Sequence, residues 1–270
     1  MKITFIGGGN MAHAILGGLI QQHWNPQTLS AVEILPEARQ KLHADFAIQT
    51  FDSINEESLP GDCLLLAIKP QHMHEAATQL APWVAGKLVI SIAAGVRCAD
   101  LSRWLGGHPR IIRVMPNTPA LVLSGISALF AAPNVSHQDR EAAQSIMAAV
   151  GQTLWVPQET DIDSVTAVSG SGPAYVFYFI EALEAAALKL GLGSESARAL
   201  ALATVVGASK LAEQSPDSVA SLRARVTSKG GTTERAIATL EQAQFKDIIN
   251  QAVKAACDRS HELAEQMGRN

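Results

Sequence analysis

The sequence has few cysteines, and their arrangement excludes two classes of protein. Its 270 residues include three cysteines, Cys63, Cys98 and Cys257, which are odd in number, widely spaced and never in a CxxC pair. This pattern indicates neither a disulfide framework nor a zinc knuckle, and it is typical of reduced thiols in a reducing compartment. We therefore expect a cytoplasmic protein.

The sequence also lacks a long uninterrupted apolar run. The most apolar stretch, residues 173–192, contains Glu181, Glu184 and Lys189, whereas a membrane span needs about 20 consecutive apolar residues. The apolar run near the N-terminus is too short for a signal peptide. These features predict a soluble protein with no membrane partner.

Positive charge is not in excess either. The formal net charge is −4 at pH 7, whereas a protein that binds nucleic acid through its phosphates normally carries a basic surplus. His72 and His74 form an HxH pair, but they begin a predicted helix, where residues two apart diverge, and no carboxylate or cysteine completes a metal set. We expect neither a nucleic-acid partner nor a bound metal.

What the sequence does contain is enough apolar material for two domains. Hydrophobic residues make up 47% of the chain, and its length exceeds that of one ordinary domain. In the first half, short β-rich runs alternate with amphipathic stretches, an order that predicts a parallel doubly wound α/β sheet over residues 1–157. The predicted strands are 3–6, 29–32, 64–68, 88–92, 111–114 and 153–156, and the predicted helices are 11–22, 36–44, 72–80 and 136–150.

After residue 157 alanine and leucine dominate, and predicted helices follow one another to the C-terminus. They cover residues 161–168, 173–190, 195–213, 218–226, 233–240 and 245–267. This pattern predicts an all-α second domain over residues 158–270. So small a helical domain often completes its core against a second copy, which predicts self-association as a homodimer and allows a larger ring of dimers.

A glycine fingerprint follows the first predicted strand. Residues 7–12 read Gly-Gly-Gly-Asn-Met-Ala, which fits the dinucleotide-binding pattern G-x-G-x-x-[G/A] between a strand and a helix. Gly7 would make the tight turn, Gly9 would let the backbone approach a pyrophosphate, and Ala12 would keep the helix close to the sheet. Glu33, at the end of the second strand, would accept the ribose hydroxyls and repel a 2′-phosphate, which favours NADH.

Three further segments concentrate small and hydroxyl residues: 113–119, 169–175 and 228–233. The first follows a predicted strand, and doubly wound sheets bind ligands at the carboxyl ends of their strands. In the other two, glycines expose backbone N–H groups just before a helix begins, so each can bind an anion such as a carboxylate.

At these motifs the sequence resembles the pyrroline-5-carboxylate reductase family. The resemblance covers the whole chain and rests on residues 5–12, 67–71, 91–96, 113–120, 169–175 and 226–233 with Ala236. It implies an N-terminal Rossmann domain, a helical C-terminal dimerisation domain and a substrate site formed between subunits. The implied reaction is reduction of (S)-1-pyrroline-5-carboxylate to L-proline with NADPH or NADH, the last step of proline biosynthesis.

The resemblance also implies the roles of individual residues. Thr233 would be the catalytic residue, a hydrogen-bond donor and proton relay at the imine nitrogen. The implied substrate-binding residues are Ser228, Gly230, Gly231, Thr232 and Ser171. The implied cofactor-binding residues are Gly7, Gly9, Asn10, Met11, Ala12, Glu33, Ala67, Lys69, Pro70, Ala93, Ala94 and Asn117. The chain departs from the family at Lys229, where proline is more usual, and at Glu33, where many relatives carry an uncharged residue suited to a 2′-phosphate.

Two other functions compete with this one. A β-hydroxyacid dehydrogenase also joins a Rossmann domain to helices, but it relies on a lysine of the helical domain, for which Lys189 and Lys210 are the candidates. A nicotinamide-responsive binding protein without turnover would use residues 228–233 to hold a phosphate or a partner peptide. Imine reduction, hydroxyacid oxidation or neither reaction distinguishes the three.

Overall fold

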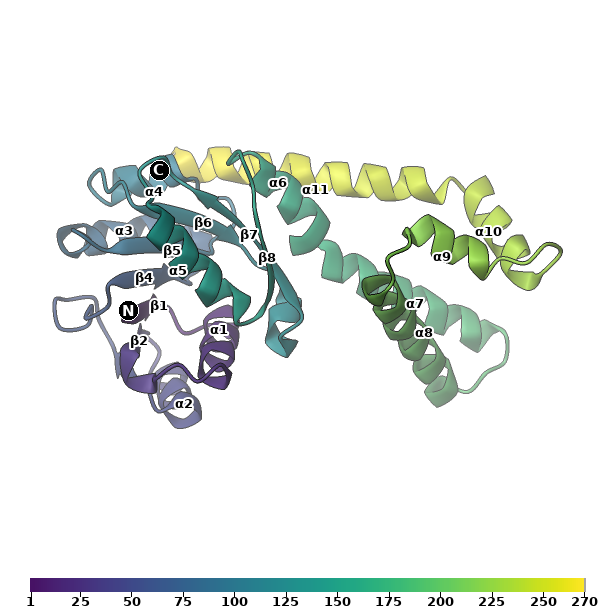
Figure 1. The fold of residues 1–270 in the computed structure, drawn as a ribbon, viewed down its shortest axis with the longest axis horizontal. Helices are drawn as coiled ribbons and strands as arrows, with labels where there is room; N and C mark the ends of the chain where they lie inside the picture. Colours follow the sequence, from purple (N-terminus) through teal and green to yellow (C-terminus); the bar gives the residue numbers. More distant parts are fainter. Residues whose placement is uncertain (270) are drawn as a thin grey trace. The chain divides into compact units, whose positions relative to one another are not determined.

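The chain divides into two compact units in a computed structural model that describes residues 1–269 (Figure 1). The first unit is Met1–Ser171 together with the chain from Ala255 onward, and the second is Gly172–Lys254. The sequence-based boundary after residue 157 follows the change from mixed to helical secondary structure, whereas these units follow packing. The domain limits 1–157 and 158–270 stay a prediction.

An eight-stranded sheet forms the centre of the first unit, in the order β3-β2-β1-β4-β5-β6-β7-β8. The strands are β1 (Ile3–Ile6), β2 (Leu29–Val32), β3 (Gln49–Phe51), β4 (Cys63–Leu66), β5 (Leu88–Ser91), β6 (Ile111–Met115), β7 (Gly125–Ala131) and β8 (Gly151–Trp155). Neighbouring strands run parallel except β6 and β7, which are antiparallel. The doubly wound, predominantly parallel sheet is thus confirmed, with β6 and β7 as its one antiparallel pair.

Helices cover both faces of this sheet and explain why its central strands are apolar throughout. The helices are α1 (Asn10–Gln21), α2 (Pro36–Phe46), α3 (Met73–Leu80), α4 (Cys98–Trp104) and α5 (His137–Ala148). One core cluster joins α1 and α5 to a face that includes Phe5, and the other joins α3 and α4 to the opposite face, which includes Ile6. Every residue of β1, β2, β4 and β5 is buried, as a strand covered on both sides requires.

Three elements of this unit were not predicted from the sequence. The edge strand β3 is short and partly exposed, so it has no apolar run to reveal it. Strand β7 starts directly after a 3-10 turn, Thr118–Val122, and α4 is only seven residues long. The strands and helices that were predicted in this unit agree with the structure to within a few residues at each end.

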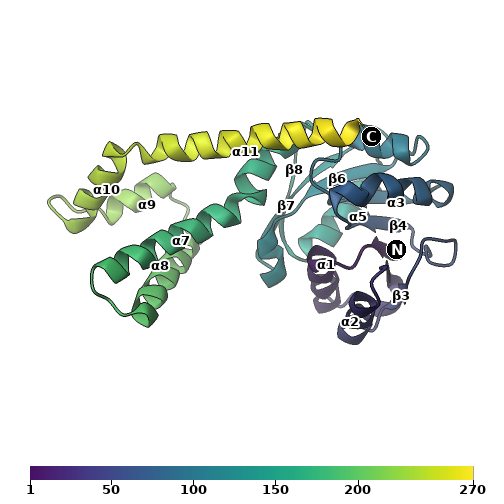
Figure 2. The ribbon, with the colours of Figure 1, turned by 180° about the vertical axis from the view of Figure 1, so that it is seen from behind.

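The second unit is entirely helical within the residues described. It contains α7 (Gly172–Lys189), α8 (Ser194–Gln214), α9 (Val219–Arg225), α10 (Thr232–Gln242) and the beginning of α11 (Phe245–Gly268). Helices α7 and α8 pack side by side, as Figure 2 shows, joined by a turn in which Gly191 has φ +90°. No residue of α7 is buried. Within residues 1–269, no helix is both long and apolar enough to cross a membrane.

The segment between the units differs from its prediction. Residues 169–175 were expected to be a loop, but α6 (Asp161–Val165) continues into a π-helical turn, Thr166–Gly170, immediately before α7. The Ser171 N–H donates to the Thr166 carbonyl oxygen at 2.8 Å. A Cβ at Gly170 would lie 2.6 Å from Met115 Cε, the mobile end of a side chain that could shift. Because α6 continues through this turn into α7, the glycines do not precede a free helix N-terminus.

Candidate active site

Most of the predicted cofactor residues follow the carboxyl ends of five parallel strands, which all lie on the same side of the sheet. Residues 7–12 follow β1, Glu33 follows β2, residues 67–70 follow β4, Ala93 and Ala94 follow β5, and Asn117 follows β6. Strands β1 and β4 are neighbours, and the chain proceeds from them toward opposite edges of the sheet. Such a switch point is where doubly wound sheets form their ligand crevice.

The glycine turn after β1 has the geometry that a bound pyrophosphate requires. Gly7 adopts φ +97°, and a Cβ on it would lie 2.7 Å from the Ala67 carbonyl oxygen, so no other residue fits without strain. Gly9 precedes α1 in an extended conformation, no side chain caps this helix, and a Cβ on Gly9 would meet nothing within 4 Å. The first N–H groups of α1 are therefore open to an anion.

Glu33 is fixed by the backbone on both sides of it. Its Oε2 accepts a hydrogen bond from the Gly8 N–H at 2.7 Å, and its Oε1 accepts one from the Leu35 N–H at 2.8 Å. Arg39 lies close by, but its Nη1 donates to the carbonyl oxygens of Glu33 and Ile34 at 2.7 and 2.9 Å. A carboxylate thus stands at the end of β2 with both oxygens oriented by the backbone, and the nearby guanidinium is bonded to carbonyl oxygens.

The remaining predicted cofactor-binding residues lie in loops and differ in exposure. Lys69 is exposed and precedes a 3-10 turn, Pro70–His72, whereas Ala93 is buried. Asn117 is buried, and its Oδ1 accepts a hydrogen bond from the Ile126 N–H at 2.9 Å. The Asn117 side chain therefore fixes the start of β7, a structural task that the sequence reasoning did not identify.

The predicted substrate residues 228–233 form a compact turn at the beginning of α10, in the second unit. Gly230 has φ +73°, and the Gly231 N–H donates to the Ser228 carbonyl oxygen at 3.0 Å. A Cβ on Gly231 would lie 2.6 Å from Ser228 Oγ, so the glycine lets this hydroxyl lie against the turn. Thr232 and Thr233 occupy the first two positions of α10, where no side chain caps the helix.

The structure adds a carboxylate to this turn. Glu234 Oε2 accepts a hydrogen bond from the Gly230 N–H at 2.7 Å, so one backbone donor of the turn is already used. Lys229, the neighbour of Gly230 in sequence, is exposed. The spacing of Glu234 from the glycines was a readable signal, since an acidic residue in the first turn of a helix commonly bonds back to the preceding backbone.

The two buried cysteines do not offer nucleophiles. Burial raises the pKa of the Cys63 and Cys98 thiols, and the nearby carboxylates of Asp139 and Glu159 respectively add to the rise. Both thiols therefore stay protonated at neutral pH. Within residues 1–269, no cluster of histidine, cysteine, aspartate and glutamate could hold a metal ion, and His74 lies against the ring of Trp104.

The fold and the glycine turn together define an oxidoreductase of the dinucleotide-binding Rossmann class. The family model "NADP oxidoreductase coenzyme F420-dependent" matches residues 2–95, and the model "Pyrroline-5-carboxylate reductase dimerisation" matches residues 159–263. The two matches thus fall on the sheet-forming half and on the helical half of the chain.

Known proteins resemble the chain over its whole length. A pyrroline-5-carboxylate reductase from Pseudomonas aeruginosa is 44% identical, with 99% of this chain and 98% of the relative covered. A solved reductase of this kind from Coxiella burnetii has a TM-score of 0.93 at 40% identity, covering 97% of this chain and 98% of that chain. A Plasmodium falciparum pyrroline carboxylate reductase, solved with NADP bound, has a TM-score of 0.86 at 31% identity and covers 98% of both chains.

The chain belongs to the pyrroline-5-carboxylate reductase family. This confirms the resemblance read from the sequence, and it confirms the Rossmann domain followed by a helical domain. Of the two lysines considered for a β-hydroxyacid dehydrogenase, Lys189 ends α7 and Lys210 is exposed on α8.

Proposed function

We propose that the chain reduces (S)-1-pyrroline-5-carboxylate to L-proline, the last step of proline biosynthesis, using a hydride that NADPH or NADH supplies. Membership of the family is the observation that carries this proposal. The reaction consumes one proton, which must reach the ring nitrogen as the C=N bond becomes a C–N bond. The reducing, cytoplasmic compartment expected for this pathway is compatible with the three free cysteines.

The dinucleotide fits the edge of the sheet. The open N–H groups at the start of α1 would hold the pyrophosphate, and Glu33 would accept the ribose hydroxyls. Asn10, Met11 and Ala12 belong to the first turn of α1, beside the pyrophosphate. Ala67, Lys69 and Pro70 would lie along the adenosine side, and Ala93, Ala94 and Asn117 would surround the nicotinamide.

The turn at residues 228–233 would hold the substrate. Ser228, Gly230, Gly231 and Thr232 would bind the carboxylate through hydroxyl and backbone donors, helped by the positive end of α10, and Ser171 would complete this set. The Thr233 hydroxyl would donate a hydrogen bond to the ring nitrogen and relay the incoming proton. Because a threonine hydroxyl is a weak acid, it would orient and pass on the proton and would not be its source.

One assay tests the whole proposal. Purified protein is mixed with pyrroline-5-carboxylate and NADH or NADPH, and nicotinamide absorbance is followed. We expect rapid oxidation of the dinucleotide with formation of proline. Turnover with a hydroxyacid but no imine reduction would favour the dehydrogenase, and binding without any oxidation would favour the non-catalytic binding protein.

We further propose a preference for NADH, which rests on the carboxylate of Glu33. Both of its oxygens are oriented by backbone donors, so the negative charge remains where a 2′-phosphate would have to enter. Arg39, the cation nearest in sequence, is engaged with two carbonyl oxygens. A 2′-phosphate would therefore meet repulsion without a free guanidinium to offset it.

Replacing Glu33 by serine is expected to shift selectivity toward NADPH. Removing the charge should raise the NADPH-to-NADH ratio of kcat/KM by about tenfold, which corresponds to about 1.4 kcal/mol, and NADH affinity itself should fall. Steady-state kinetics with both dinucleotides provides the measurement. Glu37→Ser, one helical turn further on in α2, is the matched control, and selectivity equal in both variants would remove Glu33 from this role.

We also propose that the second unit mediates self-association as a homodimer, which a ring of dimers could extend. Large apolar side chains of α7 are exposed in the single chain, among them Phe177 at 66% and Tyr178 at 73%. Isolated soluble chains rarely expose so many large side chains on one helix, and the matched family model describes a dimerisation region. The substrate site implied by the family is formed between subunits, so dimer formation and activity are expected to be lost together.

Replacing Phe177 by aspartate is expected to convert the dimer into a monomer. A charge placed in an apolar interface would have to be buried without a partner, which costs several kcal/mol. Light scattering after size-exclusion chromatography measures the mass, and turnover should fall with it. Gln79→Asp, at an exposed position of α3, adds the same charge elsewhere and should leave the mass unchanged. A dimeric Phe177→Asp would place the interface elsewhere.

A further inference from the structure

The last turns of α11 pack against the loop that follows β5, within the first unit. Gly95 of this loop has φ +73°, and a Cβ on it would lie 3.5 Å from Leu263 Cβ. Ala264 of the same helix is completely buried. The C-terminal end of α11 lies beside α4 (Figures 1 and 2). Arg103 Nη2 of α4 donates a hydrogen bond to the Gly268 carbonyl oxygen at 2.8 Å. The loop at residues 92–97 is thus covered by the C-terminal turns of the chain.

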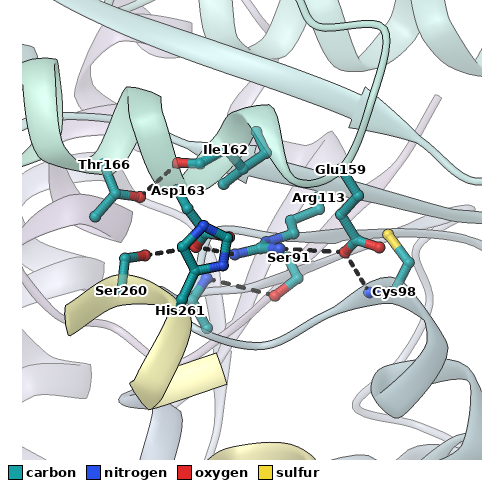
Figure 3. A network of polar contacts seen from close by, with 10 residues as sticks. Ser91, Cys98, Arg113, Glu159, Ile162, Asp163, Thr166, Ser260 and His261 are labelled. Atoms are coloured by element: carbon teal, nitrogen blue, oxygen red, sulfur yellow. Dashed lines mark hydrogen bonds and ion pairs between the residues drawn. The ribbon is translucent and has the colours of Figure 1, made fainter. Parts of the chain in front are cut away.

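A polar cluster with a buried centre, formed by Arg113, Asp163 and Ser260, lies beside this loop. Its members are Arg113 of β6, Glu159, Asp163 of α6, and Ser260 and His261 of α11 (Figure 3). Asp163 Oδ1 accepts a hydrogen bond from Ser260 Oγ at 2.6 Å, and its Oδ2 lies 3.2 Å from His261 Nδ1. The contact with Ser260 is a hydrogen bond, and the contact with His261 is at ion-pair distance. Both oxygens of the Asp163 carboxylate thus contact α11.

The same cluster also reaches the start of α4. Arg113 Nη1 donates to Glu159 Oε1 at 3.2 Å, and this oxygen also accepts the Cys98 N–H at 2.7 Å. Arg113 Nη2 lies 3.9 Å from Asp163 Oδ1. Arg113 is paired with Ser91 across the sheet, at the end of the strand that leads into the loop. The cluster therefore contacts β5 before residues 92–97, α4 after them and α11, which covers them.

A contribution to stability does not by itself explain why these charged groups are buried together. Arg113 and Asp163 are both only 2% exposed. Removing a charge from water costs several kcal/mol per ion, and the attraction between the paired charges seldom offsets this cost fully. Arg113 Nε and Nη2 have no hydrogen-bond partner within the described part of the chain. A well-packed apolar cluster would hold these elements together at lower cost, whereas directional bonds fix their relative positions.

We propose that Asp163 is a positioning residue for the nicotinamide end of the crevice. Through Ser260 and His261 it seats α11 on the loop at residues 92–97, and through Arg113 and Glu159 it fixes the start of α4. Ala93 and Ala94 are thereby held where they support the nicotinamide ring. This inference rests on the proposed function, which assigns those two alanines to the nicotinamide surroundings.

The double variant Ser260→Ala/His261→Ala tests the proposal, because it releases α11 from Asp163, whose carboxylate keeps Arg113 Nη2 at 3.9 Å as its charged neighbour. Dinucleotide affinity should be unchanged, since the glycine turn and Glu33 are untouched. The fluorescence enhancement of bound NADH should fall, because the nicotinamide ring is no longer held. With pyrroline-5-carboxylate, kcat should fall by about ten- to a hundredfold, and the isotope effect with 4-deuterated NADH should rise. Ser260→Thr retains the hydroxyl and should behave as wild type.

The controls separate positioning from folding and from the proposed function. Ser53→Ala/His137→Ala changes the same residue types at exposed positions and should alter neither readout. Unchanged fluorescence and kcat in Ser260→Ala/His261→Ala would overturn the proposal, as would equal losses of affinity and kcat, which indicate a purely structural role. If the double variant fails to fold, Ser260→Ala alone is measured by the same criteria. Wild-type protein inactive on the imine would refute the proposed function, and NADH fluorescence would still test the positioning.

Discussion

Replacing Thr233 by alanine is expected to lower kcat for pyrroline-5-carboxylate by about a hundredfold, the scale of a lost positioned proton-transfer group, while dinucleotide affinity stays unchanged. The hydroxyl stands at the second position of α10, half-buried beside the glycine turn. It would place a proton at the ring nitrogen as the C=N bond is reduced. The glycine turn after β1 lies in the other unit and is not altered by the substitution. Stopped-flow absorbance for turnover and calorimetry for dinucleotide binding measure the two quantities.

Two variants make the Thr233 result interpretable. Thr233→Ser keeps the hydroxyl and should restore most of the turnover. Thr239→Ala removes a threonine of the same helix whose hydroxyl donates to the Arg235 carbonyl oxygen at 3.1 Å, and it should leave kcat unchanged. If Thr233→Ala turned over as fast as wild type, the proton would have to reach the imine by another route, and Thr233 would lose its proposed role.

Replacing Gly7 by alanine is expected to destabilise the first unit and to abolish dinucleotide binding. The left-handed backbone costs a residue with a Cβ about 1–2 kcal/mol. The overlap with the Ala67 carbonyl oxygen and with Ile68 Cγ2, each 2.7 Å from the added carbon, costs about 1–3 kcal/mol more. Relief requires the turn to move away from β4, which displaces the N–H groups at the start of α1. Urea unfolding and calorimetric titration with NADH measure the two effects.

Gly86 offers the matched control for this prediction. It has φ +75°, but a Cβ added there would meet no atom within 4 Å. Gly86→Ala should therefore show only the cost of the left-handed backbone and should bind NADH as wild type does. If the two variants were equally stable and Gly7→Ala bound NADH normally, the overlap between the added Cβ and the chain after β4 would be relieved at no cost. The prediction for Gly7 would then be wrong.

Local signals predicted most of the first unit well. Strands β1 and β2 were located to the residue, because a fully buried strand is a short apolar run closed by glycine or charge. The predicted helix 136–150 began at Ser136, which is the N-cap of α5: its Oγ accepts the Asp139 N–H at 3.1 Å. Where the sequence carried a capping residue or a continuous apolar run, the structure followed it.

What could not be predicted depends on partners distant in the sequence. Nothing around Arg113 indicates that it is buried, because Glu159 and Asp163 reach it from a different element, and Asp163 in turn contacts Ser260 and His261 of α11. The antiparallel pairing of β7 with β6 depends on a turn that directs the chain back along the sheet. Of the candidate site, the glycine turns were recognisable as motifs, whereas the structural bonds of Asn117 and Arg39 required the folded chain.

On the proposed role of Glu33, its contacts make the choice of dinucleotide part of the architecture of the turn. Its carboxylate supplies the acceptors for the Gly8 and Leu35 N–H groups, so a smaller residue there leaves two backbone donors to find new partners. A lineage that changed from one dinucleotide to the other would therefore also need substitutions that provide new acceptors for these two N–H groups. Preference for a given dinucleotide should consequently be inherited together with the residues that follow β2, as a block and not one position at a time.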